Sequence, residues 1–175
     1  MAVTFHSDGR IDGFNASSMP TGSIIQTVVA SAPQGGSSLS LTGSITSPTF
    51  LHSDAKVTIT PQRSNSKILL TWTAQIRLDP SAYGVVGVFY SANSNMSSPS
   101  VIEKYRGGGA NLNESYRTVT SSHYMFQSWS RTCVDETISN TSVRYYNVGG
   151  YATGGTLYHG DNGVACTLIA QEIAS

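Results

Sequence analysis

Apolar and polar residues alternate along several segments of this chain. The longest such segment is Lys67–Leu78, in which Ile68 and every second residue after it are apolar. Successive side chains of a β-strand point to opposite faces, so this segment is predicted to be a strand with one buried face. No window of about eleven or more residues has the spacing of an amphipathic helix. The pattern therefore predicts an all-β protein.

Further strands are predicted where alternation recurs or where β-branched and aromatic residues gather. Clusters of Gly, Pro, Asn, Asp and Ser between them, including the glycine pairs at 149–150 and 154–155, indicate turns. Many short strands separated by frequent turns are typical of an antiparallel β-sandwich, and a jelly-roll-like sandwich is the predicted fold. The further predicted strands are 23–30, 56–60, 83–90, 116–129, 143–148 and 164–173.

The segment 83–90 (YGVVGVFY) is apolar on both of its faces. It is therefore predicted to be buried twice, or to be buried on one face and covered on the other by a neighbouring subunit. A single sandwich would leave much of this apolar surface in water, which favours a homo-oligomer.

The charge of the chain excludes several classes of protein. There are 10 Lys and Arg against 10 Asp and Glu, and only 11% of the residues are charged, compared with about 25% in an average soluble protein. A neutral chain without a basic cluster is not expected to bind nucleic acid. No apolar run reaches the roughly 18–20 residues of a membrane span, and the N-terminus lacks the pattern of a secretory signal. A weakly charged surface favours a protein packed in an assembly or lying outside a cell.

Residues 1–22 differ from the rest because they lack sustained alternation. We interpret them as an N-terminal arm that is ordered when docked on another protein; a frayed terminus is the alternative. The predicted organisation is thus an arm, 1–22, and a β-sandwich head, 23–175. The residues of the arm predicted to make the docking contacts are Phe5, Arg10, Ile11 and Phe14.

Four short stretches of the sequence resemble a known group of proteins. They are PTGSIIQTV at 20–28, ITP followed by SNSKILL within 59–70, TLIAQEIA at 167–174, and FHSDGRI at 5–11. These motifs are similar to those of small all-β virion proteins and tail-fibre tips of tailed bacteriophages, especially marine and cyanobacterial phages. The resemblance implies a component of the virion exterior, a homotrimer, with a β-sandwich head and an N-terminal attachment segment. It carries over no catalytic residue.

The resemblance suggests two functions. In the first, the chain is a tail-fibre or fibre-tip protein whose head presents loops to a host-surface glycan; in the second, it is a capsid decoration or head-fibre protein with a purely structural role. Tyrosine combines a flat apolar face with a hydroxyl group, which suits contacts with sugars. Many of the tyrosines, including Tyr145 or Tyr146, are expected to pack inside the sandwich, whereas Tyr105 and Tyr151 are expected in loops. The candidate receptor-binding residues are Tyr105, Arg106, Asn111 and Tyr151.

Candidate residues for chemistry are sparse. Cys133 and Cys166 match no metal-ligand spacing, and two small buried thiols are expected in place of a disulfide. Asp135 and Glu136 are the only adjacent carboxylates, and neighbours in a strand would face opposite ways, unlike a glycosidase pair. The glycines at 107–109 lack the flanking residues of a phosphate-binding loop.

The four histidines share no short spacing, so no metal site is predicted from them. No cofactor and no enzymatic activity are expected, and a carbohydrate-active enzyme is the third hypothesis. The histidines are His6, His52, His123 and His159.

Overall fold

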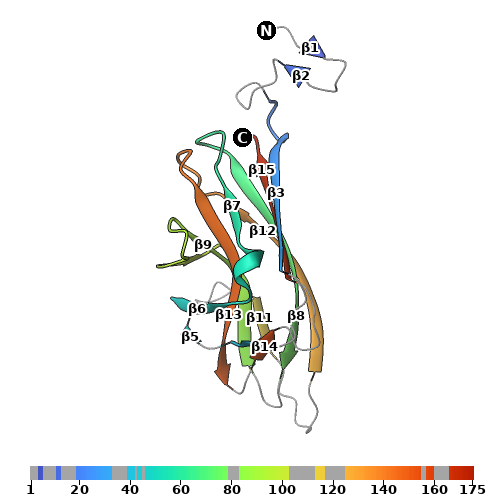
Figure 1. Ribbon diagram of the computed structural model, residues 1–175, viewed down its shortest axis with the longest axis vertical. Coiled ribbons are helices and arrows are strands. Elements are labelled where there is room, and N and C mark those ends of the chain that lie inside the picture. The colour runs from blue at the N-terminus through green and yellow to red at the C-terminus, as the bar shows by residue number, and fades with distance from the viewer. Residues whose placement is uncertain are drawn as a thin grey trace.

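The computed structural model describes residues 4–5, 11–12, 19–32, 39–41, 43–44, 46–78, 83–102, 113–116, 125–154, 157–159 and 166–175. In this part of the chain the only helix is a 3-10 turn, η2 (Ser53–Ala55), and every strand pairing is antiparallel. None of its helices has the length and apolar character needed to cross a membrane. The expected all-β architecture, with antiparallel sheets that pack as a sandwich, is confirmed (Figure 1).

One sheet has six strands, with β8 (Lys67–Leu78) at its centre. β12 (Met125–Asp135) pairs along one edge of β8, while β15 (Cys166–Ile173) and β14 (Leu157–His159) follow one another along the other edge. β3 (Ile24–Ala32) then pairs with β15, and β4 (Leu39–Ser40) pairs with β14.

The other sheet has seven strands, with β13 (Arg144–Gly154) at its centre. β9 (Tyr83–Ser91) pairs along one edge of β13, and β10 (Ser100–Val101) and β11 (Asn113–Tyr116) pair with the far edge of β9. β7 (Val57–Ile59) and β6 (Ser47–Phe50) pair with the other edge of β13, and β5 (Gly43–Ser44) pairs with β6.

The chain crosses repeatedly between the two sheets. It runs from β3 in the six-stranded sheet to β6 and β7, back to β8, across to β9, β10 and β11, back to β12, across to β13, and returns to end at β15. Neighbouring strands are therefore far apart in sequence: β15 lies between β3 and β8 although it is the last strand of the chain.

The main core lies between the sheets. The alternating apolar residues of β8, among them Ile68, Leu70 and Trp72, are 0% exposed, and they pack in one cluster with Val148 and Tyr146 of β13. Burial of a large apolar side chain contributes roughly 1.5–3 kcal/mol. The alternation along Lys67–Leu78 thus reflects a strand with one buried face, as predicted, and the strand has the predicted bounds.

A second apolar cluster covers the outer face of the seven-stranded sheet. Val85 and Phe89 point away from the main core and are buried, at 2% and 0% exposed, together with Met96 from the 92–99 loop. Strand 83–90 is therefore buried on both faces by its own chain. Of the two predicted alternatives, burial of both faces within the chain is the one that the structure shows, so this strand gives no separate argument for a neighbouring subunit. The partly buried residues packed against this cluster are Phe50, Val101, Tyr145 and Tyr151.

Two local predictions are corrected by the model. The segment 116–129 was predicted to be one strand, but its two ends belong to two different strands. Tyr116 ends β11 and Met125 begins β12, and the residues between them lie outside the described part of the chain. The predicted turn at 149–150 lies inside β13, where Gly150 allows close approach of β9: a Cβ there would lie 2.5 Å from the carbonyl oxygen of Val85. These glycines are needed for packing and do not end the strand.

Both cysteines are free thiols. Cys166 is buried as predicted, whereas Cys133 is only half-buried. Burial raises the pKa of the Cys166 thiol to about 12, so this group stays protonated and inert at neutral pH.

We predict that Gly150→Ala destabilises the protein by about 1–3 kcal/mol, because the added methyl group meets the backbone of β9, which cannot move without distorting the sheet. Gly149→Ala is the matched control. Its Cβ would meet the Phe50 ring at 3.0 Å, and this side chain can shift, so the loss should be smaller. Urea unfolding of the three proteins measures both values, and equal losses would contradict this account.

Candidate functional site

A groove opens along one side of the sandwich, between edge strand β10 of one sheet and strand β12 of the other. Its volume is about 360 Å³. One wall is formed by Val101 and Ile102, and the other by residues 132–137 at the end of β12. This groove is the candidate functional site because it is a concave surface lined by both apolar and polar side chains.

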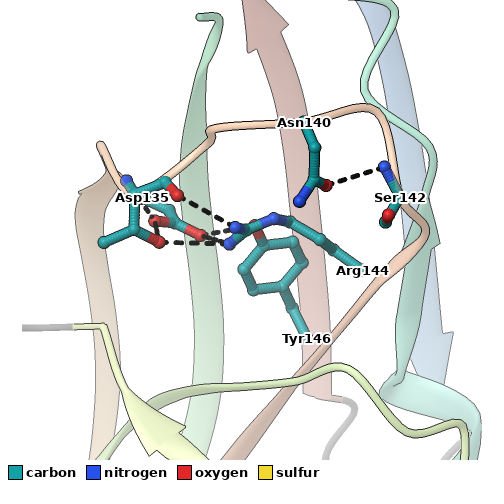
Figure 2. Close-up of polar contacts among 6 residues, drawn as sticks. Asp135, Asn140, Ser142, Arg144 and Tyr146 are labelled. Carbon is teal, nitrogen blue, oxygen red and sulfur yellow. Dashed lines mark hydrogen bonds and ion pairs between the residues drawn. The ribbon is translucent and has the colours of Figure 1, made fainter. Parts of the chain in front are cut away.

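Asp135, one of the residues that line the groove, belongs to a buried ion pair. Arg144 lies on the core-facing side of β13, and its Nη1 donates to Asp135 Oδ2 at 2.7 Å, with side-chain exposures of 7% and 0%. The guanidinium also lies 4.3 Å from the centre of the Tyr90 ring, a cation–π contact. Figure 2 shows Arg144 and Tyr146 converging on Asp135 from β13. The pair links the two sheets at this end of the sandwich.

Every acceptor position of the Asp135 carboxylate is used. Oδ1 accepts from the backbone N–H of Thr137 at 2.8 Å and from its hydroxyl at 2.6 Å, while Oδ2 accepts from Arg144 and from the Tyr146 hydroxyl at 2.7 Å. A carboxylate has about four lone-pair sites, so Asp135 has no acceptor position left for a substrate proton. These hydrogen bonds hold the segment that connects β12 to β13.

Tyr146 acts in this cluster as a neutral hydrogen-bond donor. Burial raises the pKa of its hydroxyl far above the ordinary value, and the neighbouring Asp135 carboxylate raises it further. The hydroxyl therefore stays protonated at every physiological pH. Tyr145 faces the opposite side of the strand and packs on the outer cluster, so both tyrosines pack against apolar side chains, on opposite faces of the sheet.

These residues were missed as a set by sequence reasoning. Asp135 was weighed only as a catalytic carboxylate beside Glu136. Two local signals were available: an Asp followed two residues later by Thr, which suits a side-chain-to-backbone turn, and Arg144 in phase with apolar residues, which requires a buried partner. Which residue is that partner can be seen only in the tertiary structure.

Of the four candidate receptor-binding residues, the structure describes only Tyr151. The other three follow Ile102, a residue that lines the groove, in the sequence. They are Tyr105, Arg106 and Asn111, and they lie outside the described residues. Tyr151 was expected in a loop, but it lies in β13, opposite Val85, half-buried against the outer cluster.

A second buried carboxylate fixes the end of the sandwich from which the arm leaves. Glu172 of β15 is 0% exposed. Its Oε1 accepts from the backbone N–H groups of Gln62 and Arg63, at 2.8 and 3.1 Å, and from the Ser66 hydroxyl, while its Oε2 accepts from Gln26 Nε2 at 2.6 Å. Three of these residues, Gln26, Ser66 and Glu172, belong to the motifs at 20–28, 59–70 and 167–174 that the sequence analysis singled out. The motifs therefore meet in one hydrogen-bond network.

The arm joins the head at this network. Gly22 donates its backbone N–H to Ala174 at 2.7 Å, and Arg63 Nη2 donates to the carbonyl of Met19 at 2.7 Å. Further along the arm, the strands β1 (Thr4–Phe5) and β2 (Ile11–Asp12) form a short pair in which Phe5 is opposite Ile11. Of the predicted docking residues, these two are thus brought together, whereas Arg10 and Phe14 lie outside the described residues.

The 92–99 loop is a further feature that sequence reasoning did not identify. Met96 is 5% exposed although its φ is +57°, a strained backbone value for a non-glycine residue. The loop is held by its own hydrogen bonds and by Lys56 Nζ, which donates to Ser94 at 2.6 Å. Among the residues that the model describes, no group of three His, Cys, Asp or Glu side chains is arranged to hold a metal ion.

Comparison with known proteins identifies no family. No protein-family model matches the chain, and no curated protein matches it in sequence. The chain is similar to a chain of the T13 particle of infectious bursal disease virus, with 16% identity, a TM-score of 0.29 and 87% of this chain covered. The similarity to VP2 in the subviral particle of that virus has 11% identity, a TM-score of 0.27 and the same coverage.

The chain spans 37% and 38% of the length of these two viral chains. TM-scores this low assign neither a fold nor a function to this chain.

We predict that Asp135→Asn destabilises the protein far more than Tyr146→Phe. The first change leaves the buried Arg144 charge unpaired, which costs about 3–5 kcal/mol, whereas the second removes one hydrogen bond at a cost of about 1 kcal/mol. Chemical unfolding followed by circular dichroism measures both. Equal effects would show that the ion pair does not hold the two sheets together.

We also predict that Glu172→Gln destabilises the head by about 1–3 kcal/mol for each donor left unpaired, because an amide presents one acceptor oxygen where the carboxylate presents two. The neighbouring residue gives a matched control, since Gln171 points to the outer face and Gln171→Ala should change the stability by less than about 0.5 kcal/mol. Thermal unfolding of the pair distinguishes them, and similar midpoints would contradict a central role for Glu172.

Proposed function

We propose that this chain is a structural protein on the exterior of a virion, with a jelly-roll head. The observation that carries this proposal is the strand order. With β6 and β7, and β10 and β11, each taken as one interrupted strand, the sheets read β3-β15-β8-β12 and β7-β13-β9-β10. This interleaved order of eight strands supports a jelly roll made of two Greek keys, an architecture found in viral capsid and lectin domains.

The motifs shared with phage virion proteins support the same proposal. They fall at the start of β3, at the start of β8 and along β15, three neighbouring strands of one sheet. Their polar residues meet at Glu172, so the motifs describe one packed corner of the head. A fold by itself does not specify a function, and the resemblance is what directs the proposal to a virion.

We propose further that the arm attaches the head to another virion protein, as a tail-fibre or fibre-tip protein. The arm leaves the head beside the C-terminal end of β15, and β1 and β2 lie beyond that end of the sandwich (Figure 1). Apolar residues at the paired positions Phe5 and Ile11 suit a docking contact. The homotrimer implied by the resemblance would give three heads, and several weak sites acting together bind more tightly than one.

In this proposal the groove between β10 and β12 contacts a host-surface glycan together with the segment 103–112, which follows Ile102 in the sequence. The segment supplies Tyr105 for stacking on a sugar ring and Arg106 and Asn111 for hydrogen bonds. The rigid wall formed by residues 132–137 is held by the Asp135 cluster, which keeps the groove in one shape.

The second candidate is a capsid decoration or head-fibre protein. It is favoured by the short link between arm and head, since β2 ends at Asp12 and β3 begins at Ile24, which leaves no room for a fibre shaft. Both candidates use the same arm and differ in the surface to which it docks.

We predict that the full-length protein binds susceptible host cells or their surface polysaccharide at micromolar concentration, and that Tyr105→Ala weakens this binding by about tenfold or more, as expected for loss of an aromatic anchor. Ser94→Ala, in an exposed loop of the outer cluster, is the control. Cryo-electron microscopy of labelled particles then shows the head on the tail or on the shell. Failure to find the protein in particles would overturn the virion proposal, and particles whose heads bind no cell surface would overturn only the receptor role.

A further inference from the structure

The arm meets the head at a tight turn that follows Met19. The backbone N–H of Ser23 donates to the carbonyl of Pro20 at 3.0 Å, and Gly22, the third residue of this turn, has a φ of +87°. Thr21 is not among the residues with a positive φ. A four-residue turn whose third position alone has a positive φ is a type II turn, which favours glycine at that position. This conformation accounts for the glycine of the PTGS motif.

The head holds this turn from one side through the residue that follows β15. Gly22 donates its backbone N–H to the carbonyl of Ala174 at 2.7 Å, and Ala174 donates its own N–H to the carbonyl of Ser23 at 2.9 Å. Ala174 is 2% exposed, so water has little access to these two bonds. The turn therefore continues the pairing of β3 with β15 beyond the bounds of both strands.

Arg63 holds the arm from a second side. Its Nη2 donates to the carbonyl of Met19 at 2.7 Å, one residue before the turn. The backbone N–H of Arg63 donates to the buried Glu172 carboxylate at 3.1 Å. The side chain that reaches the arm thus starts from a backbone that is already fixed to the core, which lowers the entropy lost when the guanidinium binds.

Apolar burial does not hold the turn, because Pro20, Thr21 and Gly22 are exposed. The hydrogen bonds within the turn, to Ala174 and from Arg63 are what fix it. Segments that move freely have few such bonds.

We propose that residues 19–23 form a rigid joint, with Arg63 as its latch, which fixes the direction in which the arm leaves the head. A head attached through its arm is then held at one angle to the surface on which the arm docks. The joint belongs to the free chain, so this inference does not depend on the proposed virion function.

Backbone ¹⁵N relaxation of the 175-residue chain tests the latch. The order parameters of Met19, Thr21, Gly22 and Ser23 should be about 0.85, as for rigid backbone, and Arg63→Ala should lower that of Met19 below about 0.6. Gln62→Ala is the matched control. Gln62 also donates its backbone N–H to Glu172, at 2.8 Å, but its side chain donates to Thr60 and not to the arm, so Met19 should behave as in the wild type.

Substitutions of Gly22 test the turn. In Gly22→Ala the added Cβ meets no atom within 4 Å outside its chain neighbours, so any effect comes from the positive φ. The backbone N–H of Ala174 should then exchange with solvent several-fold faster than in the wild type, because its acceptor on Ser23 is displaced. Gly22→Asn should exchange more slowly than Gly22→Ala, since asparagine tolerates a positive φ better.

Circular dichroism verifies that each variant is folded, and the Gly22 variants still test the joint if Arg63→Ala does not fold. Wild-type order parameters below about 0.6 at residues 19–23 would overturn the proposal, because the arm would then hang on a flexible tether. The same order parameter at Met19 in Arg63→Ala and Gln62→Ala would refute the latch. Unchanged exchange at Ala174 in Gly22→Ala would refute the turn.

Discussion

The structure depends on one buried carboxylate, that of Glu172. A charged group that is 0% exposed is tolerated only when hydrogen bonds replace the lost water. Here the replacements come from the 60–66 turn and from Gln26, so the carboxylate joins the turn between β7 and β8 to two strands that lie far away in sequence. Because the arm is tied to the same turn through Arg63, this single interaction sets where the arm leaves the head.

Asp135 is a second buried carboxylate that joins distant segments at the same end of the sandwich. In strand register, Gln26, Glu172, Ile68 and Asp135 form one row across the inner face of the six-stranded sheet. Two carboxylate networks thus flank an apolar residue and close the end of the core. One holds the arm, and the other holds the wall of the groove. The Asp135 carboxylate has no spare acceptor position, which fits rigid support better than proton transfer.

Away from this end the structure is governed by apolar packing, and the two sheets differ. Strand β9 is apolar on both faces, and its chain provides a second cover through a loop that accepts backbone strain at Met96 in order to bury that side chain. Strand β8 is apolar on its inner face and mixed on its outer one, and no loop among the described residues covers Val29 or Val134 of the neighbouring strands. The exposed aliphatic side chains are therefore on the sheet whose central strand alternates most regularly in sequence.

The sequence by itself determined the class of the fold, most of the strands and the two-sided burial of 83–90, since strand period and residue type are local properties. Lys67–Leu78 is the clearest case. Only the tertiary structure decided the order of the strands, the place of Gly149 and Gly150 inside β13, the half-buried position of Tyr151 and the partners of Asp135 and Glu172. Each of these depends on contacts between segments up to 146 residues apart. The local sequence pattern does not tell which distant segment packs against a strand. A buried side chain or polar group can be satisfied by any segment that has the right shape and hydrogen-bonding groups.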